Sequence, residues 1–298
     1  MGITHVVRGQ EWISSTPKHL LLYRWLGIDP PAFAHMPLLR DERKAKISKR
    51  KSPWARLTWF REQGYLPEAL VNFLALQGYP PILEDDGTER EVFTFDEFAK
   101  RFDWAKVNPA GSIFNLDKLD WLNGVWIREL PLGEFASRLL PFLESEGILS
   151  KNPSLGELAR LKSVAALIQT RIVKLTEASA LVAPFFLGDD VIEIAADARA
   201  QLDAQSPAVL DAALHALGNL DDHPRGLLGS ESDWAAARIE EVLREAIVQG
   251  LGVKPKVAFG PLRTAVAGQR ISPPLFESME ILGKTSTLAR LQALRDTL

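Results

Sequence analysis

The sequence contains no cysteine, only five histidines and no long apolar run. Without cysteine there is no disulfide, thiolate nucleophile or zinc–thiolate site, which fits a reducing cytoplasm. The histidines show no His-x-x-His or His-Glu-x-x-His spacing, so no metal site is predicted. No apolar stretch approaches the roughly 20 residues of a membrane span. The first residues contain no secretory signal, and Val6 stands where a myristoylation motif needs serine or threonine.

Charge is distributed unevenly along the 298 residues, whose net charge is −3. Residues 1–61 hold twelve basic and four acidic side chains, a net charge of +8, so the rest of the chain carries −11. Within that remainder, residues 177–245 are acidic and residues 251–298 are again basic. Two basic stretches around an acidic one are compatible with a polyanion that contacts the chain at both ends, and equally with solvated faces of uneven charge.

The chain has room for two or three domains, and its pattern begins as α/β. Residues 3–8 predict a strand by their β-branched alternation. A helix is expected to follow, with Thr16 as N-cap, Pro17 at its first position and its end at Gly27. The next 20 residues include three prolines and are expected to be irregular or extended. A second helix is predicted over 66–77. Its core face should carry Leu66, Leu70, Phe73, Leu74 and Gln77.

Beyond residue 110 the pattern becomes helical, because good helix formers dominate. A helix is predicted over 232–249, beginning at Ser232, and a last one over roughly 286–298. Helix-breaking prolines are expected at the edges of segments: Pro131, Pro141, Pro153, Pro184 and Pro207. The core face of the 232–249 helix should carry Ile239, Val242, Leu243, Ala246 and Ile247. That of the 286–298 helix should carry Leu291, Leu294 and Leu298.

The opening strand and helix cannot form a doubly wound sheet by themselves. A strand of a parallel sheet needs neighbours on both sides, and the sequence predicts too few of them here. The N-terminus is therefore expected to be the middle of a domain whose first part is absent from this sequence.

A dense basic cluster lies between Arg40 and Arg61, with nine basic residues and two acidic ones. Like charges this close repel one another unless an anion or water screens them. A bare cluster is most often a solvated loop or a localisation patch. The form Lys46-Ile47-Ser48-Lys49-Arg50, the lysine loop, is more specific. Mobile ammonium groups of this kind can stabilise the charge that builds on a triphosphate while a carboxylate attacks its α-phosphorus.

The lysine loop resembles the Lys-Met-Ser-Lys-Ser/Arg signature of class I aminoacyl-tRNA synthetases. Its surroundings resemble one branch of that class, the bacterial glutamyl-tRNA synthetases. The resemblance extends over essentially the whole chain. The segments that carry it are residues 4–12, 15–17, 35–39, 54–78, 115–124, 261–263, 274–277 and 282–284.

The resemblance implies roles for residues that precede the lysine loop. Arg8 falls on the arginine that holds the glutamate carboxylate, a role suited to a bidentate guanidinium; a surface ion pair at a strand end is the alternative. Trp12 matches the wall of the glutamate site, or else packs in the core. Glu11 matches a position at the ATP ribose, and Leu39 one whose backbone meets adenine. Gln10 departs from the acidic residue usual in the family, so the resemblance implies no charged group at that position.

Within the lysine loop, Lys46 and Lys49 fall on the catalytic lysines that contact the ATP phosphates, and Arg50 assists them. Four aromatic residues follow the loop: Trp54, Trp59, Phe60 and Tyr65. They either contact the tRNA acceptor stem or pack in the core, and core packing is favoured for at least two of them.

Further along, the resemblance implies contacts with the tRNA anticodon. Arg171 falls on a position that reads the third anticodon base, where arginine favours an enzyme that separates glutamate tRNA from glutamine tRNA; a solvated helix arginine is the alternative. Arg263, Ser272, Pro273 and Leu275 fall on a second stretch that contacts anticodon bases. Such mixed planar, apolar and polar surfaces bind unstacked bases. Ser272 replaces a common threonine and keeps its hydroxyl.

The implied fold is mostly α with a partial α/β portion. Residues 1–45 would be the remainder of a Rossmann-type catalytic domain, and 46–125 the lysine loop with the stem-contact domain. Residues 126–182 and 183–298 would form two all-helical anticodon-binding domains. The implied activity is ATP-dependent ligation of L-glutamate to tRNA(Glu), with Mg²⁺, by a cytoplasmic monomer.

The sequence lacks the other class I signature, His-Ile-Gly-His. We therefore expect the chain not to aminoacylate tRNA by itself. One alternative is a stand-alone tRNA-binding module without catalysis. A glutaminyl-tRNA synthetase is a weaker one, since that family usually ends in β-barrels. The related glutamyl-queuosine enzymes lack C-terminal helical domains, and a purely structural helical scaffold leaves the lysine loop unexplained.

Overall fold

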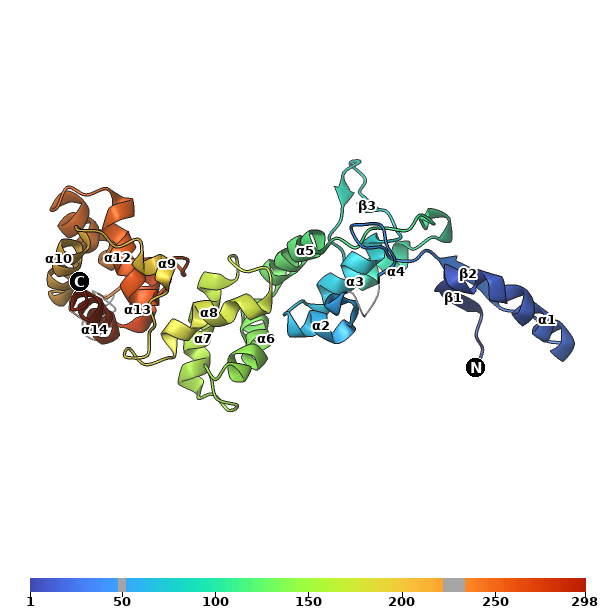
Figure 1. Ribbon diagram of the computed structural model, residues 1–298, viewed down its shortest axis with the longest axis horizontal. Helices are drawn as coiled ribbons and strands as arrows, with labels where there is room; N and C mark the ends of the chain where they lie inside the picture. The colour runs from blue at the N-terminus through green and yellow to red at the C-terminus, as the bar shows by residue number, and fades with distance from the viewer. Residues whose placement is uncertain (48–51, 222–233) are drawn as a thin grey trace. The chain divides into compact units, whose positions relative to one another are not determined.

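The structure, a computed structural model, describes residues 1–47, 52–221 and 234–298. Its described part is mostly helical with a few short strands (Figure 1), which confirms the predicted fold class. The chain divides into two compact units, Met1–Trp126 and Ile127–Leu298. The finer division into four domains stays a prediction. Lys49, Arg50 and Ser232 lie outside the described residues.

The first unit opens with a β–α–β arrangement. β1 (His5–Gly9) leads through a 3-10 turn, η1 (Gln10–Ser15), into α1 (Thr16–Leu26), and β2 (Ala32–Met36) then pairs parallel with β1. This confirms the predicted first strand and first helix.

The ends of α1 are set by different means. Gly27 ends the helix in the left-handed region, with φ of 64°, where glycine carries no steric penalty. At the other end, the expectation that Thr16 is the N-cap is wrong. Ser15 occupies that position without a capping hydrogen bond, and the Thr16 hydroxyl accepts a hydrogen bond from Arg8 instead.

β2 lies inside a stretch that the prolines predict to be irregular or extended. Pro30 and Pro31 precede the strand and Pro37 follows it, so no proline occupies a position that must donate within the ladder. The prolines therefore bracket a strand.

The remainder of the first unit is built around short helices. These elements are η2 (Pro53–Ala55), α2 (Leu57–Glu62), α3 (Pro67–Leu76), β3 (Ile82–Leu83), β4 (Glu89–Arg90), α4 (Phe95–Arg101), η3 (Trp104–Lys106) and α5 (Leu116–Glu129). α5 continues across the boundary between the two units. Phe60 and Tyr65 are buried in the core of this unit, and Trp54 and Trp59 pack against it, which favours the core alternative for all four aromatics. On α3, Leu74 departs from its predicted burial and is 43% exposed.

The second unit is helical throughout its described residues. Its elements are α6 (Leu132–Ser145), α7 (Leu155–Ile168), η4 (Leu175–Glu177), α8 (Ala178–Val182), η5 (Ala183–Phe185), α9 (Ala196–Arg199), α10 (Ser206–Gly218), α11 (Ala236–Leu243), the π-helix η6 (Arg244–Gln249), α12 (Pro255–Ala267), α13 (Leu275–Leu282) and α14 (Lys284–Arg295). Ile239, Leu243 and Ile247 are fully buried, as predicted for their helix. Leu291 and Leu294 are buried too, but Leu298 follows α14 and is exposed.

Pro141 lies inside α6 and not at its edge, contrary to the prediction. Its side chain is on the exposed side of the helix. There, water can hydrate the carbonyl that loses its usual partner, so the helix continues past the proline. Within the described residues, no helix is both long and apolar enough to cross a membrane.

Candidate functional site

Arg8 is positioned by the register of the parallel strands. β1 places Arg8 directly beside His35 of β2, and α1 follows with Thr16 and His19 one turn apart. Three separate donors of the guanidinium use these neighbours: Nε donates to His35 Nε2 (3.1 Å), Nη1 to His19 Nδ1 (3.1 Å) and Nη2 to Thr16 Oγ1 (2.8 Å). The predicted arginine is therefore held at a fixed orientation, and its partners were not singled out by the sequence.

Aromatic rings complete the surroundings of Arg8. Its Cζ lies 5.0 Å from the ring centre of Phe33 and 5.8 Å from that of Trp12, within cation–π range. Trp12 is 49% exposed, so its alternative as a core residue does not hold in this chain. Arg8 also lines a cavity of about 450 Å³ together with Val6, His19, Leu22, Tyr23, Leu26 and Phe33.

A tight turn reverses the chain just before the lysine loop and places Lys46 beside Arg40. Arg40 pairs with Lys46 in an antiparallel bridge, and Ala45 N–H donates to Asp41 Oδ1 (2.8 Å). Lys44 adopts a φ of 60° within this turn. As a result Lys46 Nζ lies 3.8 Å from Glu11 Oε1. Two residues predicted to contact ATP are thus brought together from segments 35 positions apart.

Leu39 has a structural role in the first unit. Its side chain packs against the core of the first unit, and its carbonyl accepts from Ile47 N–H (3.4 Å). This pairing fixes the segment immediately before the lysine loop.

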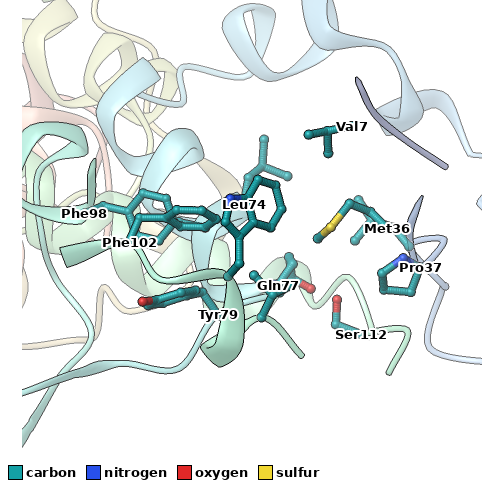
Figure 2. A pocket seen from close by; sticks show the side chains of 14 residues that line it. Val7, Met36, Pro37, Leu74, Gln77, Tyr79, Phe98, Phe102 and Ser112 are labelled. Atoms are coloured by element: carbon teal, nitrogen blue, oxygen red, sulfur yellow. The ribbon is translucent and has the colours of Figure 1, made fainter. Parts of the chain in front are cut away.

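An apolar pocket of about 350 Å³ lies on the other face of β1, because Val7 points away from the side that carries Arg8. In Figure 2, Phe98, Phe102 and Tyr79 line one side of it and Met36 and Pro37 the other. Two buried oxygens, Gln77 Oε1 and Ser112 Oγ, have no hydrogen-bond partner among the residues described. No charged side chain lines this pocket, so it does not suit a triphosphate.

In the second unit the structure gathers four of the five residues predicted to contact the anticodon. Arg263, on α12, donates from Nη1 to Ser272 Oγ (2.9 Å) and to the Pro273 carbonyl (3.1 Å). Arg171, in the turn after α7, donates to the Ser272 carbonyl (3.5 Å). Leu275 differs, since its side chain is buried in the core at 4% exposure and is not presented to a ligand.

The two arginines lie close enough to affect each other. Burial, and then the positive charge of Arg171, hold the pKa of Arg263 below its usual range. Within the described ranges neither arginine forms an ion pair with a carboxylate. Two cations held together without an anion make a surface that favours an acceptor-rich ligand.

Beside Arg263 is a cavity of about 420 Å³ that the sequence-based candidates did not include. Its wall adds two cations and an aromatic ring, from Lys256, Arg270 and Phe259. The only signal for them in the sequence was the basic character of residues 251–298. Among the described residues no group of three or more histidine, aspartate or glutamate side chains is placed to hold a metal ion.

Comparison with protein families matches two models to the chain. One is described as "tRNA synthetases class I (E and Q), catalytic domain" and matches residues 1–121. The other is described as "Anticodon binding domain" and matches residues 134–295. The first contains the Arg8 and Lys46 regions, and the second contains Arg171, Arg263 and Ser272.

Similar proteins match this chain along nearly its whole length. The glutamate–tRNA ligase of Acidothermus cellulolyticus is 52% identical over 293 residues, which are 98% of this chain and 55% of that protein. That of Cutibacterium acnes is 47% identical over 296 residues, 98% of this chain and 56% of that protein. The chain therefore spans about half the length of the curated relatives it matches.

Solved structures give the same result for the fold. The crystal structure of a glutamate tRNA ligase from Elizabethkingia meningosepticum, in complex with its amino acid, superimposes with a TM-score of 0.78 at 25% identity. The superposition covers 99% of this chain and 57% of that one.

Proposed function

The chain belongs to the class I glutamyl-tRNA synthetase family, and we propose that it takes part in the ATP-dependent attachment of L-glutamate to tRNA(Glu). The first unit would form one side of the active site, and the second unit would bind the anticodon. The observation that carries this proposal is the contact between Lys46 and Glu11, which places the first residue of the lysine loop beside the turn after the strand of Arg8. A cytoplasmic monomer is part of the proposal.

Glutamate would bind at Arg8. The guanidinium has five N–H donors, and its described neighbours use three of them, so two remain for a carboxylate. The half-exposed Trp12 would form the wall of this site.

ATP would bind across Glu11, Leu39 and the lysine loop. The exposed Lys46 would neutralise charge on the phosphates, together with Lys49 and Arg50. Glu11 would accept from ribose hydroxyls, and the backbone of Leu39 would meet adenine. Mg²⁺ would enter with the ATP phosphates.

The anticodon of tRNA(Glu) would bind at Arg171, Arg263, Ser272 and Pro273. Neutral bases and phosphates both accept hydrogen bonds, which suits two arginines without a carboxylate partner. Arg171 would read the third anticodon base and favour tRNA(Glu) over glutamine tRNA. Leu275 would support the site from the core.

We infer that the chain does not charge tRNA by itself, since the His-Ile-Gly-His signature is absent from its 298 residues. The test compares the purified chain alone with the complemented protein, defined as the chain mixed with the part of the Acidothermus cellulolyticus ligase that it does not match. We expect salt-sensitive binding of tRNA(Glu) by the chain alone, and charging only by the complemented protein.

Each other outcome has a distinct meaning. Charging at an ordinary rate by the chain alone would contradict its inferred inactivity. Binding of tRNA without charging in the complemented protein would favour the stand-alone tRNA-binding module. Absence of tRNA binding would contradict both the proposed synthetase role and the stand-alone tRNA-binding module.

A further inference from the structure

The three hydrogen bonds of Arg8 determine the protonation of the side chains that receive them. A guanidinium has only donors, so each histidine nitrogen that faces it must offer a lone pair. His35 Nε2 and His19 Nδ1, both 3.1 Å from Arg8, are therefore unprotonated. A protonated imidazole has no lone pair and would place a second cation beside Arg8, so this geometry suits neutral acceptors.

The same reasoning assigns a tautomer to each ring. His35 carries its proton on Nδ1, and His19 carries its proton on Nε2. Thr16 Oγ1 also lies 3.2 Å from His35 Nε2, but Arg8 uses the lone pair of that nitrogen, so the Thr16 hydroxyl directs its proton to the Trp12 carbonyl, 3.1 Å away. Thr16 then accepts from Arg8 with its oxygen. The Nδ1–H form is the less favoured one for a free imidazole, so finding it at His35 would be diagnostic.

A second arginine in the same unit shows the alternative arrangement. Arg90 is held by the carboxylates of Glu84 (2.5 Å) and Glu97 (3.0 Å), which neutralise its charge. These contacts raise the pKa of Arg90, chiefly through the hydrogen bond to Glu84. Arg8 is fixed by three hydrogen bonds, yet no carboxylate in the described chain lies within ion-pair distance of it. Its positive charge is oriented without being neutralised.

We propose that His19 and His35 are positioning residues which hold Arg8 by neutral acceptors and so keep its full charge available to the glutamate carboxylate. An aspartate or glutamate in either position would orient Arg8 equally well, but it would repel the ligand. The parallel register supplies His35, and the helical spacing of Thr16 and His19 supplies the other side. The inference rests on the proposed glutamate-binding role of Arg8.

The first experiment needs neither glutamate nor the complementing segment. Long-range ¹H–¹⁵N spectra of the labelled chain at neutral pH report the tautomer of each of its five histidines. Single substitutions assign the signals. We expect the Nδ1–H form at His35 and the Nε2–H form at His19. His215, exposed on α10 of the second unit, serves as the reference for an unconstrained ring. An Nε2–H or doubly protonated His35 would overturn the proposal.

The second experiment measures the dissociation constant of L-glutamate for the complemented protein by calorimetry. H35L and H19L each remove an acceptor, and each should weaken binding about tenfold, the usual size for a hydrogen bond to a charged group. H35Q and H19N place an oxygen where Nε2 or Nδ1 stood, so both should recover most of the affinity. The matched control H215L should bind as the unsubstituted protein does.

The outcomes separate this inference from the function it rests on. Wild-type affinity in both leucine variants, or equal loss in the leucine and amide variants, would overturn the positioning role while glutamate binding stands. Expected tautomers without any glutamate binding would overturn glutamate as the ligand. Circular dichroism of the amide variants checks that they keep their fold, so that a loss of affinity is not mistaken for unfolding.

Discussion

Lys46 Nζ lies 3.8 Å from Glu11 Oε1, so the lysine loop begins beside the turn that follows β1. Both side chains are well exposed, 64% for Lys46 and 45% for Glu11. Exposed pairs of this kind contribute roughly 0–1 kcal/mol to stability. The contact therefore matters for the position of the ammonium group and little for the fold.

Lys46→Ala should accordingly separate catalysis from stability. In the complemented protein we expect kcat of ATP–pyrophosphate exchange to fall by about 100-fold or more, because the lysine acts on charge that develops during reaction. The free energy of unfolding should change by less than about 0.5 kcal/mol. Exchange kinetics and urea unfolding measure the two quantities. Lys100→Ala, at an exposed lysine of α4, is the matched control. A higher KM for ATP with unchanged kcat would show ground-state binding instead.

Arg171→Ala should weaken tRNA(Glu) binding by about 1–3 kcal/mol without changing its salt dependence, as expected for a contact to a base. Fluorescence anisotropy at several salt concentrations measures both. With this variant, tRNA transcripts altered at the third anticodon base should bind as tightly as the unaltered transcript. Arg138→Ala is the control, since Arg138 pairs with Glu134 on α6. A shallower salt slope with unaltered base preference would assign Arg171 to a phosphate.

Local sequence signals predicted the elements that depend on local chemistry. α1 ends at Gly27 because only glycine adopts its left-handed conformation without cost, and the buried stripe of α11 follows from helical spacing alone. The position of Pro141 was misjudged for a physical reason. A proline's effect depends on whether its missing donor faces water or a partner, and that is a tertiary property.

The candidate sites were predictable only where one residue carries the chemistry. Arg8 and Lys46 were predicted in this way, through motifs, and their roles stay predictions. His19 and His35 were missed because the register of β1 against β2 and the face of α1 bring them to Arg8, and neither is visible in a one-dimensional pattern. Leu275 shows the converse, since a matched position can be filled by a side chain that faces the core.

The second unit should lose stability in acid for a reason that can be traced to the first turn of α7. The backbone N–H and then the hydroxyl of Ser154 donate to Glu157, which lowers the pKa of that carboxyl. A group whose pKa is lower in the folded state stabilises above its unfolded pKa, and this contribution disappears as the pH falls through the folded value. Asp211, whose pKa Arg295 lowers by hydrogen bonding, acts in the same direction.

Ser154→Ala removes the donor hydroxyl and the N-cap, and should cost about 1 kcal/mol at neutral pH. It should also flatten the acid side of the stability profile in part, because the hydroxyl no longer lowers the pKa of Glu157 while the backbone N–H of residue 154 still does. Thermal unfolding by circular dichroism across the acidic range tests both effects. Ser163→Ala, at an exposed mid-helix serine of α7, is the control. An unchanged slope in acid would rule out the Ser154 hydroxyl as a source of this acid sensitivity.

Arg290 presents the opposite situation to Arg8, since it is a buried arginine that depends on its carboxylate. It is 4% exposed, donates from Nε to Asp189 Oδ1 (2.7 Å) and from Nη1 to the Val266 carbonyl (2.9 Å). Asp189→Ala leaves this charge buried without its anion. The expected cost is roughly 3 kcal/mol, the lower end for breaking a buried pair, because Asp189 is itself one-third exposed.

The double variant Asp189→Ala/Arg290→Met tests whether the cost comes from the stranded charge. Replacing both partners removes the unpaired cation and fills its space with an apolar chain, so most of the lost stability should return. Hydrogen–deuterium exchange of α12 and α14 reports the second unit separately from the first. Additive losses in the double variant would mean that packing around Arg290, and not its charge, stabilises this part of the unit.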